Sequence, residues 1–125
     1  MKISTIMHPQ FQKVLSDLTQ QPVPMSAAFK LKGIVGQIEN EMRSYDETRK
    51  TAIQRLADKN TDGSVVTLEN GSAKFSDENL KIFVQELNDL LASEIEIGSI
   101  TLASLGDRVI ISASDLAILD SLIKE

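Results

Sequence analysis

The sequence predicts a mostly helical α+β protein, in which a long antiparallel helical hairpin bearing a β-hairpin stands on a small base of sheet and helix. Three observations predict this class. Apolar residues recur at heptad-like spacing over two long segments, an Asn-Gly pair lies between short β-type runs, and the alternating segment EIEI opens a tail of short elements. The 125 residues suffice for a single domain. We expect residues 26–93 to form the arm, and residues 1–25 and 94–125 to form the base.

The N-terminal part of the base is predicted to be a strand followed by a short helix. Residues 2–7, KISTIM, contain three β-branched residues, which favours a strand. Four apolar residues spaced i, i+3, i+4 and i+7 from Phe11 to Leu18 form one stripe and predict a helix over about residues 9–20. The segment QPVPMS ends this helix, because proline cannot continue it.

A long helix is predicted from the capping residue Ser26 to about residue 57. Its stripe keeps the spacing 4, 3, 4, 3, 4, 3, 4, which is typical of a heptad seam. Gly33 and Gly36 each cost roughly 1 kcal/mol in a helix interior, so they mark either a bend or a close helix contact. The stripe consists of Leu31, Val35, Ile38, Met42, Tyr45, Arg49, Ala52 and Leu56, with Arg49 as the one interruption.

The Asn70-Gly71 pair between SVVTL and SAKF predicts a β-hairpin over residues 64–75. Ser76 is suited to cap a third helix over residues 77–93. The apolar stripe of this helix contains Leu80, Val84, Leu87 and Leu91, and it is widened by Phe83 and Leu90.

The tail is predicted to complete the base. EIEI at residues 94–97 and RVIIS at residues 108–112 predict strands that join residues 2–7 in a small sheet. Residues 98–107 fit either a strand or a short helix. A last helix is predicted after Ser112, with Leu116, Leu119 and Ile123 on its apolar face.

Composition and charge narrow the function classes. The net charge of −5 argues against general nucleic-acid binding, and the absence of cysteine excludes disulfides and thiolate chemistry. No apolar run is long enough to span a membrane and the N-terminus does not resemble a secretory signal, so we expect a cytoplasmic protein with no membrane partner. Residues 1–57 are net basic and residues 58–125 net acidic, which fits either two halves folding together or a basic partner for the acidic half.

The segment DKNTDGSVVTLE, residues 58–69, fits the pattern of a calcium-binding loop at every defined position. Such a loop needs a helix directly after its final glutamate, but Asn70-Gly71 follows at once. We therefore interpret the segment as a connector built from turn residues, and we keep a calcium-binding loop as an alternative hypothesis. The ligands of that loop would be Asp58, Asn60, Asp62, Ser64 and Glu69.

No enzyme signal is recognisable in the sequence, and we expect no cofactor. His8 is the single histidine, and no nucleophile and orienting partner stand at a recognisable spacing from it. The carboxylate pairs Glu94 with Glu96 and Glu86 with Asp89 are interpreted as solvated faces.

The order of long helix, Asn-Gly hairpin and return helix resembles the β-type prefoldin arrangement. Over about residues 28–97 the chain also resembles a group of small phage and prophage proteins. The elements that carry this resemblance, together with the N-terminal MKIS, are DETRK, KNTDGS, AKFS, FVQELNDLL and EIEI. The resemblance implies a phage or prophage origin and a prefoldin-like fold. It implies no activity for any residue.

These observations lead us to expect a non-enzymatic protein-interaction module that binds a host or virion protein with the tip of the arm. An isolated hairpin must bury one face, which either contacts the partner or packs on the helices. The candidate contact residues are Val65, Val66, Leu68 and Phe75.

The two long helices are unequal in length, so we also expect a homo-oligomer, a dimer, in which a second copy or the short helices cover the longer one. An alternative is a protein that sequesters a small nucleotide signal in a pocket between copies. Lys30, Lys32 and Arg108 are the candidate basic groups for that pocket.

Overall fold

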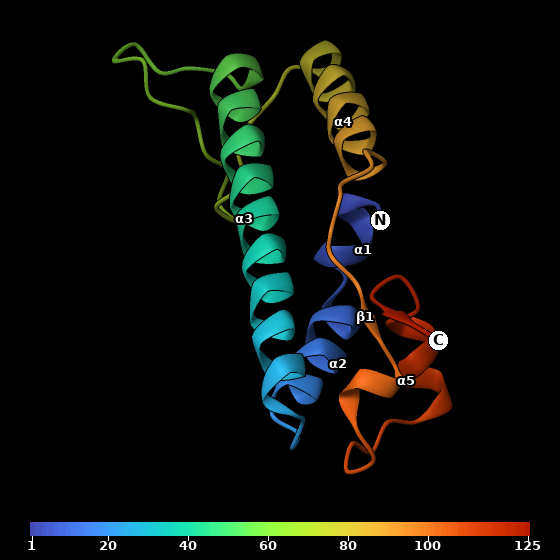
Figure 1. Cartoon of the computed structure of the whole chain (residues 1–125). Coiled ribbons are helices and arrows are strands. Elements are labelled where there is room, and N and C mark those ends of the chain that lie inside the picture. The colour runs from blue at the N-terminus through green and yellow to red at the C-terminus, as the bar shows by residue number, and fades with distance from the viewer. The chain divides into compact units, whose positions relative to one another are not determined.

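The computed structural model describes all 125 residues (Figure 1). The chain divides into two compact units. Unit 1 consists of residues 1–42 and 94–125, and unit 2 of residues 43–93. The chain is 58% helical and has one two-stranded parallel sheet, so a mostly helical α+β protein is confirmed. The boundary between the units lies within the longest helix, whereas the sequence suggested a boundary between base and arm at residue 26.

The helices are α1 (Ile3–Met7), α2 (Pro9–Thr19), α3 (Met25–Leu56), α4 (Asp77–Leu91) and α5 (Ala113–Ile118). A short 3-10 helix, η1, spans Ala103–Leu105, and the strands are β1 (Ile100–Thr101) and β2 (Ile123–Lys124). The helices predicted over residues 9–20, 26–57 and 77–93 are therefore present, as α2, α3 and α4, with ends within two residues of those expected. None of the helices combines the length and the apolar character that crossing a membrane requires.

The predicted strand at residues 2–7 is wrong, because this segment forms helix α1. Ile3 and Ile6 are three residues apart, so one helical face carries both side chains into the protein interior. His8 and Pro9 end α1 and begin α2. The Nδ1 atom of His8 accepts a hydrogen bond from the Gln10 amide at 3.2 Å, so the single histidine is an exposed helix cap.

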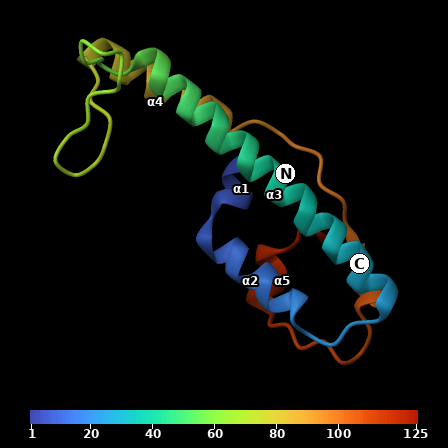
Figure 2. The same cartoon turned by 90° about the vertical axis from the view of Figure 1, so that its left-hand side faces the viewer.

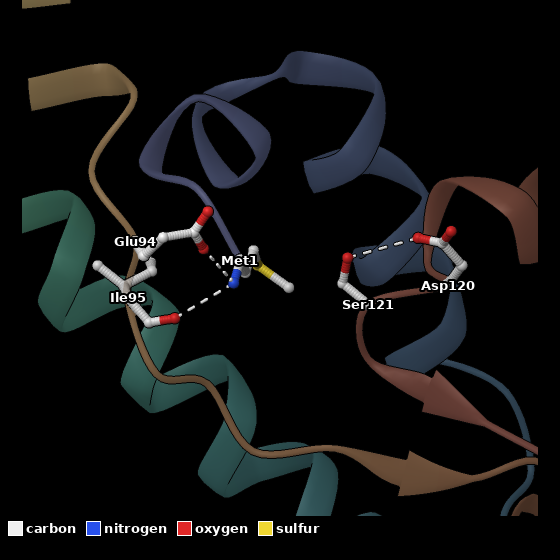
Figure 3. A network of polar contacts seen from close by, with 5 residues as sticks. All are labelled: Met1, Glu94, Ile95, Asp120 and Ser121. Carbon is white, nitrogen blue, oxygen red and sulfur yellow. Dashed lines mark hydrogen bonds and ion pairs between the residues drawn. The ribbon is translucent and has the colours of Figure 1, made fainter. Parts of the chain in front are cut away.

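The predicted base sheet of residues 2–7, 94–97 and 108–112 is also wrong. The sheet that exists joins β1 and β2 in parallel, with Ile100 opposite Ile123. Residues 94–97 form one bridge, between Lys2 and Glu94. Figure 3 shows the contacts beside it, where the Met1 amino group donates to Glu94 Oε2 at 3.0 Å and to the Ile95 carbonyl at 3.3 Å.

The predicted strand at residues 108–112 is replaced by a pairing with one side chain. The side-chain Nε2 of Gln21 donates to the Ile110 carbonyl at 2.6 Å, and its Oε1 accepts from the Ile110 backbone amide at 2.7 Å. Both backbone groups of Ile110 are thus satisfied without a neighbouring strand. Residues 98–107, which the sequence left open, contain β1 and η1, one after the other.

The last helix is shorter than the prediction. Ser112 caps α5 by accepting from the Asp115 amide at 3.1 Å, as the sequence suggested. The helix ends at Ile118, and a turn delivers Ile123 to the sheet. The predicted helical position of Ile123 is wrong because its backbone pairs with β1 and its side chain is buried there.

The core of unit 1 is apolar throughout and contains no buried polar side chain. The inner face of α3 packs against residues of α2 and of the C-terminal tail, and α2 lies beside α1 and α5 (Figure 1). The buried cluster consists of Ile6, Phe11, Val14, Leu15, Leu18, Ala27, Leu31, Ile34, Ile38, Ile100, Leu105, Leu119, Leu122 and Ile123.

Replacing Ile6 by Ala is expected to destabilise the protein by about 2–5 kcal/mol, because removing a fully buried side chain leaves a cavity. Ile110→Ala is the matched control. Its side chain is 85% exposed, so the free energy of unfolding should change by less than about 0.5 kcal/mol. Urea unfolding followed by circular dichroism measures both. Equal losses for the two variants would contradict the packing of α1 in the core.

Candidate interaction surface

Unit 2 consists of the last part of α3, a connecting segment at residues 57–76, and α4. Helix α4 begins as the sequence predicts. Ser76 Oγ accepts from the Asn79 amide at 3.2 Å, and two acidic residues follow in the first turn, where the helix dipole favours negative charge. Asn79 Nδ2 donates to the carbonyl of Leu56 at 3.0 Å, which ties the start of α4 to the end of α3.

The connecting segment contains two tight turns and no assigned strand (Figure 2). In the first, the Asn60 amide donates to the Ser64 carbonyl and the Gly63 amide to the Asn60 carbonyl. In the second, Leu68, Ser72 and Gly71 make the same two bonds. Both glycines have a φ near +85°, which an L side chain adopts only with strain. Each turn is therefore a three-residue loop with a glycine bulge.

Three backbone hydrogen bonds close the segment into a ring. The Asp58 amide donates to the Lys74 carbonyl, Lys74 donates to Val66, and Val66 donates back to Asp58, at 2.8 to 2.9 Å. No strand is assigned over the predicted β-hairpin of residues 64–75, but an isolated antiparallel bridge, Thr67 with Ala73, spans its Asn70-Gly71 turn, and a second bridge joins Lys59 with Val65. The extra pairing partner is residue 58, which the sequence interpretation assigned to a plain connector.

The sequence carries a signal for these twin turns that the motif analysis missed. The three ring residues, Asp58, Val66 and Lys74, are spaced by eight, and N-T-D-G-S at residues 60–64 is followed eight positions later by L-E-N-G-S. The Asp-Gly-Ser and Asn-Gly-Ser endings place the same turn residues at the same offsets. Comparing the sequence with itself at a shift of eight residues predicts two equivalent turns, whereas the calcium-loop pattern suggests one ligand loop.

The carboxylate of Asp62 is engaged within the first turn. Its Oδ1 atom accepts from the Ser64 hydroxyl at 2.6 Å and from the Ser64 amide at 3.0 Å. The hydroxyl bond and then the amide bond hold the pKa of Asp62 below its usual range. In the second turn the uncharged Asn70 takes the same place, accepting from the Ser72 amide at 3.0 Å.

The residues of the alternative calcium loop lie on both turns. Asn60, Asp62 and Ser64 stand in the first turn, where Asn60 Nδ2 donates to Ser64 Oγ at 3.0 Å, and Glu69 stands in the second. Asp58 lies in the backbone ring. No group of three or more acidic or histidine side chains in the structure is arranged to hold a metal ion. The helix that follows Glu69 begins only at Asp77, eight residues later.

The predicted contact residues of the tip differ in their surroundings. Phe75 stacks on Phe83 of α4, with ring centroids 4.9 Å apart and planes inclined by 24°. Val65 and Val66 are half-buried, and Leu68 is the most exposed of the four. Phe75 therefore holds the connecting segment on α4, whereas Leu68 is free for an external contact.

Helix α4 has no buried residue, although six of its apolar residues share one side. Phe83, Leu87 and Leu90 line a groove toward α3, while the side chains of Leu80 and Val84 remain 45% and 46% exposed. Fifteen of the seventeen buried apolar residues of the protein belong to unit 1, and unit 2 contributes only Leu56 and Ala57. Unit 2 thus presents an apolar helix side without a core of its own.

The groove between α3 and α4 has a volume of about 650 Å³. Its α4 side carries three apolar residues and two carboxylates, and its α3 side carries mostly hydroxyl and charged groups. Arg55 bridges the groove with an ion pair to Glu86 at 2.6 Å. The lining also includes Arg49, Glu47 and Asp89, so charges of both signs face the same space. On α3, Lys50 and then Arg49 hydrogen-bond Asp46 and lower its pKa.

The basic residues proposed for a nucleotide pocket do not gather at one place. Arg108 lines a hollow of about 260 Å³ with Pro22 and Pro24, whereas Lys32 lines a different hollow on α3. Lys30 is exposed and lines neither. Glu94 pairs with the Met1 amino group, and Glu86 with Arg55, so these two carboxylates have charged partners.

No family model, no curated protein sequence and no solved structure matches this chain.

The first turn is expected to be acid-sensitive. Because the folded pKa of Asp62 is depressed, its hydrogen bonds stabilise the turn above the ordinary aspartate pKa of about 3.9 and are lost as the pH falls through the lower folded value. The Ser64 amide shift, followed by NMR between pH 7 and 2, reports this transition. Its midpoint should lie below that of an unstructured aspartate.

Asp62→Asn is the matched variant, because Asn70 already makes the same amide contact in the second turn. The Ser64 shift should then be independent of pH while the turn remains formed. A wild-type midpoint at or above the ordinary value would contradict the assignment of the two Ser64 bonds.

Proposed function

We propose that this chain is a non-enzymatic interaction protein of phage or prophage origin that binds a host or virion protein through unit 2. The observation that carries the proposal is α4, a 15-residue amphipathic helix with none of its residues buried. The phage origin rests on the resemblance of the sequence elements over residues 28–97. Such a protein would act in the cytoplasm of the host or as part of the virion.

The energetics of unit 2 favour an external partner. A unit of 51 residues with two buried apolar side chains has little hydrophobic stabilisation of its own. Covering Leu80, Val84 and Leu68 would add about 25 cal/mol for each Å² of apolar surface removed from water. A partner that supplies an apolar face therefore gains affinity from the same surface that unit 2 leaves uncovered.

The finer architecture is part of this proposal. We infer an antiparallel helical hairpin of the prefoldin-like kind in unit 2, with the twin turns at its end. The bond from Asn79 to the Leu56 carbonyl and the Arg55–Glu86 ion pair support it, because both join the last turns of α3 to α4.

The charges of the groove favour a protein partner over a small anion. Arg49 and Arg55 share the lining with Glu47, Glu86 and Asp89, so a nucleotide phosphate would meet more negative than positive groups. A protein surface carries both signs and can pair with each. For this reason the nucleotide-sequestering alternative has less support than the interaction module.

A pull-down from host lysate with and without phage infection tests the proposal, with three versions of the tagged chain as bait. The Leu80→Asp/Val84→Asp double variant is expected to lose at least tenfold of the captured partner, because it charges the uncovered side of α4. Ile82→Asp is the matched control. This residue is 45% exposed on the same helix, but two positions from each target and hence on another side.

Thermal unfolding of all three versions separates contact from stability. The exposed substitutions should leave the free energy of unfolding within about 0.5 kcal/mol of the wild type. Phe75→Asp should destabilise unit 2, because it removes the stacking on Phe83, and it is therefore unsuitable as a contact variant. Undiminished capture by the double variant, or equal loss with Ile82→Asp, would refute unit 2 as the binding surface.

A further inference from the structure

The first part of α3, within unit 1, has an uncovered face that the core does not use. Met25 and Phe29 stand four residues apart on this face, and their side chains are 89% and 79% exposed. The opposite face of the same helix carries the buried Ala27, Leu31, Ile34 and Ile38. Two large apolar side chains are therefore left to solvent on an ordered helix.

Gly36 lies on the same side of the helix, and no contact within the chain requires a glycine at this position. A Cβ atom added to Gly36 would meet no atom within 4 Å, so no neighbouring segment requires the glycine. Glycine in a helix interior costs about 1 kcal/mol relative to alanine. Gly36 also lines a hollow of about 450 Å³, which Val35 and Leu31 line as well. Thr19 of α2 and Val23 also line this hollow.

The charges beside the hollow are complementary under a twofold rotation. Lys32 and Glu39 both line it, and the point midway between them along the helix falls between Val35 and Gly36. Of the four charged residues between positions 25 and 42, Lys32 and Glu39 share the side of Gly36, whereas Lys30 and Glu41 lie more than roughly 100° away around the helix. A second, antiparallel copy of the helix centred there brings each lysine-bearing segment against the glutamate-bearing one.

We propose that this face of α3 packs in an antiparallel manner against the same face of a second copy, crossing near Gly36. Residue 36 then allows close approach of the two helices, whose separation depends on the side chains at the contact. Lys32 of each copy lies against Glu39 of the other, twice in the symmetric interface. In this register Phe29 lies at the level of Met42 of the second copy, and its cover by the partner helix gives the hydrophobic part of the association.

The occupant is a second copy because the face is self-complementary in charge. An unrelated partner would need no such relation between Lys32 and Glu39, and an anionic membrane surface would be repelled by Glu39. The interface also gives a structural role to Gly36, which otherwise only lowers the helix propensity. It belongs to unit 1, so it is independent of the interaction proposed for unit 2.

Sedimentation velocity of the full chain over a range of concentrations tests the proposal. The wild type is expected to form a dimer. Gly36→Leu should abolish it, because the side chain fills the approach between the helices, while the monomer stays folded in the open space. Gly33→Leu is the matched control. It is the same substitution at a similarly open glycine that does not line the hollow, and the dimer should persist.

A charge exchange identifies the register. Lys32→Glu alone and Glu39→Lys alone should each weaken the dimer by about tenfold, because like charges then face each other at two places. An equimolar mixture of the two variants should restore it as a heterodimer, which native mass spectrometry recognises if one variant carries a mass label.

Three results would overturn the proposal. One is a wild type that stays monomeric at every concentration, and another is a dimer that neither Gly36→Leu nor the single charge variants weaken. The third is a monomeric wild type that co-sediments with phosphatidylglycerol vesicles, which would assign Met25, Phe29 and Lys32 to a lipid surface. The α4 variants that lose partner capture are expected to dimerise like the wild type. Failure of the dimer proposal and failure of the proposed function are therefore distinguishable.

Discussion

The burial of one face of α3 is the interaction on which the folded part of this protein depends. Leu31, Ile34 and Ile38 carry the middle of the apolar cluster in unit 1, and α2 supplies four further buried residues to it. Burial of side chains of this size contributes about 1.5–3 kcal/mol each relative to leaving them exposed. The short elements of the tail are ordered around this helix, because β1, η1 and β2 each contribute a buried residue to the same cluster.

The same helix extends into unit 2, where its surroundings are different. There the stripe continues as Tyr45, Ala52 and Leu56, but only Leu56 is buried. Unit 2 relies instead on polar ties, namely the twin glycine turns, the backbone ring and the Arg55–Glu86 pair. These exposed polar interactions fix the local geometry but add little to the free energy of unfolding, since an exposed ion pair is worth about 0.2–1 kcal/mol. The contrast between an apolar unit 1 and a thinly packed unit 2 is the reason that unit 2 is the better candidate for holding another protein.

In this sequence the helical periodicity of apolar residues predicted the helices correctly. The alternating pattern predicted which residues are buried, but it did not predict a strand. In EIEI the residues Ile95 and Ile97 are half-buried and the two glutamates exposed, as alternation predicts. No ladder forms, because a ladder needs a second strand in register and the neighbouring segment, residues 3–7, is helical. Ile110 illustrates the same point, since its backbone pairs with a glutamine side chain from residue 21. The candidate surface was predicted in part: Leu80 and Val84 were recognised as helix stripe residues, but their exposure was not.

The sequence by itself determined the helices α2, α3 and α4, the cap of α4 at Ser76 and that of the short α5 at Ser112, and the turn residues of the connecting segment. Those features depend on interactions within a few residues, between side chains one turn apart or between a cap and the next amides. Only the tertiary structure decided which stripe residues are covered, that Ile123 joins a parallel sheet, and that Gly36 faces open space. These outcomes depend on segments distant in the chain, and a local pattern contains no information on which distant segment supplies the contact.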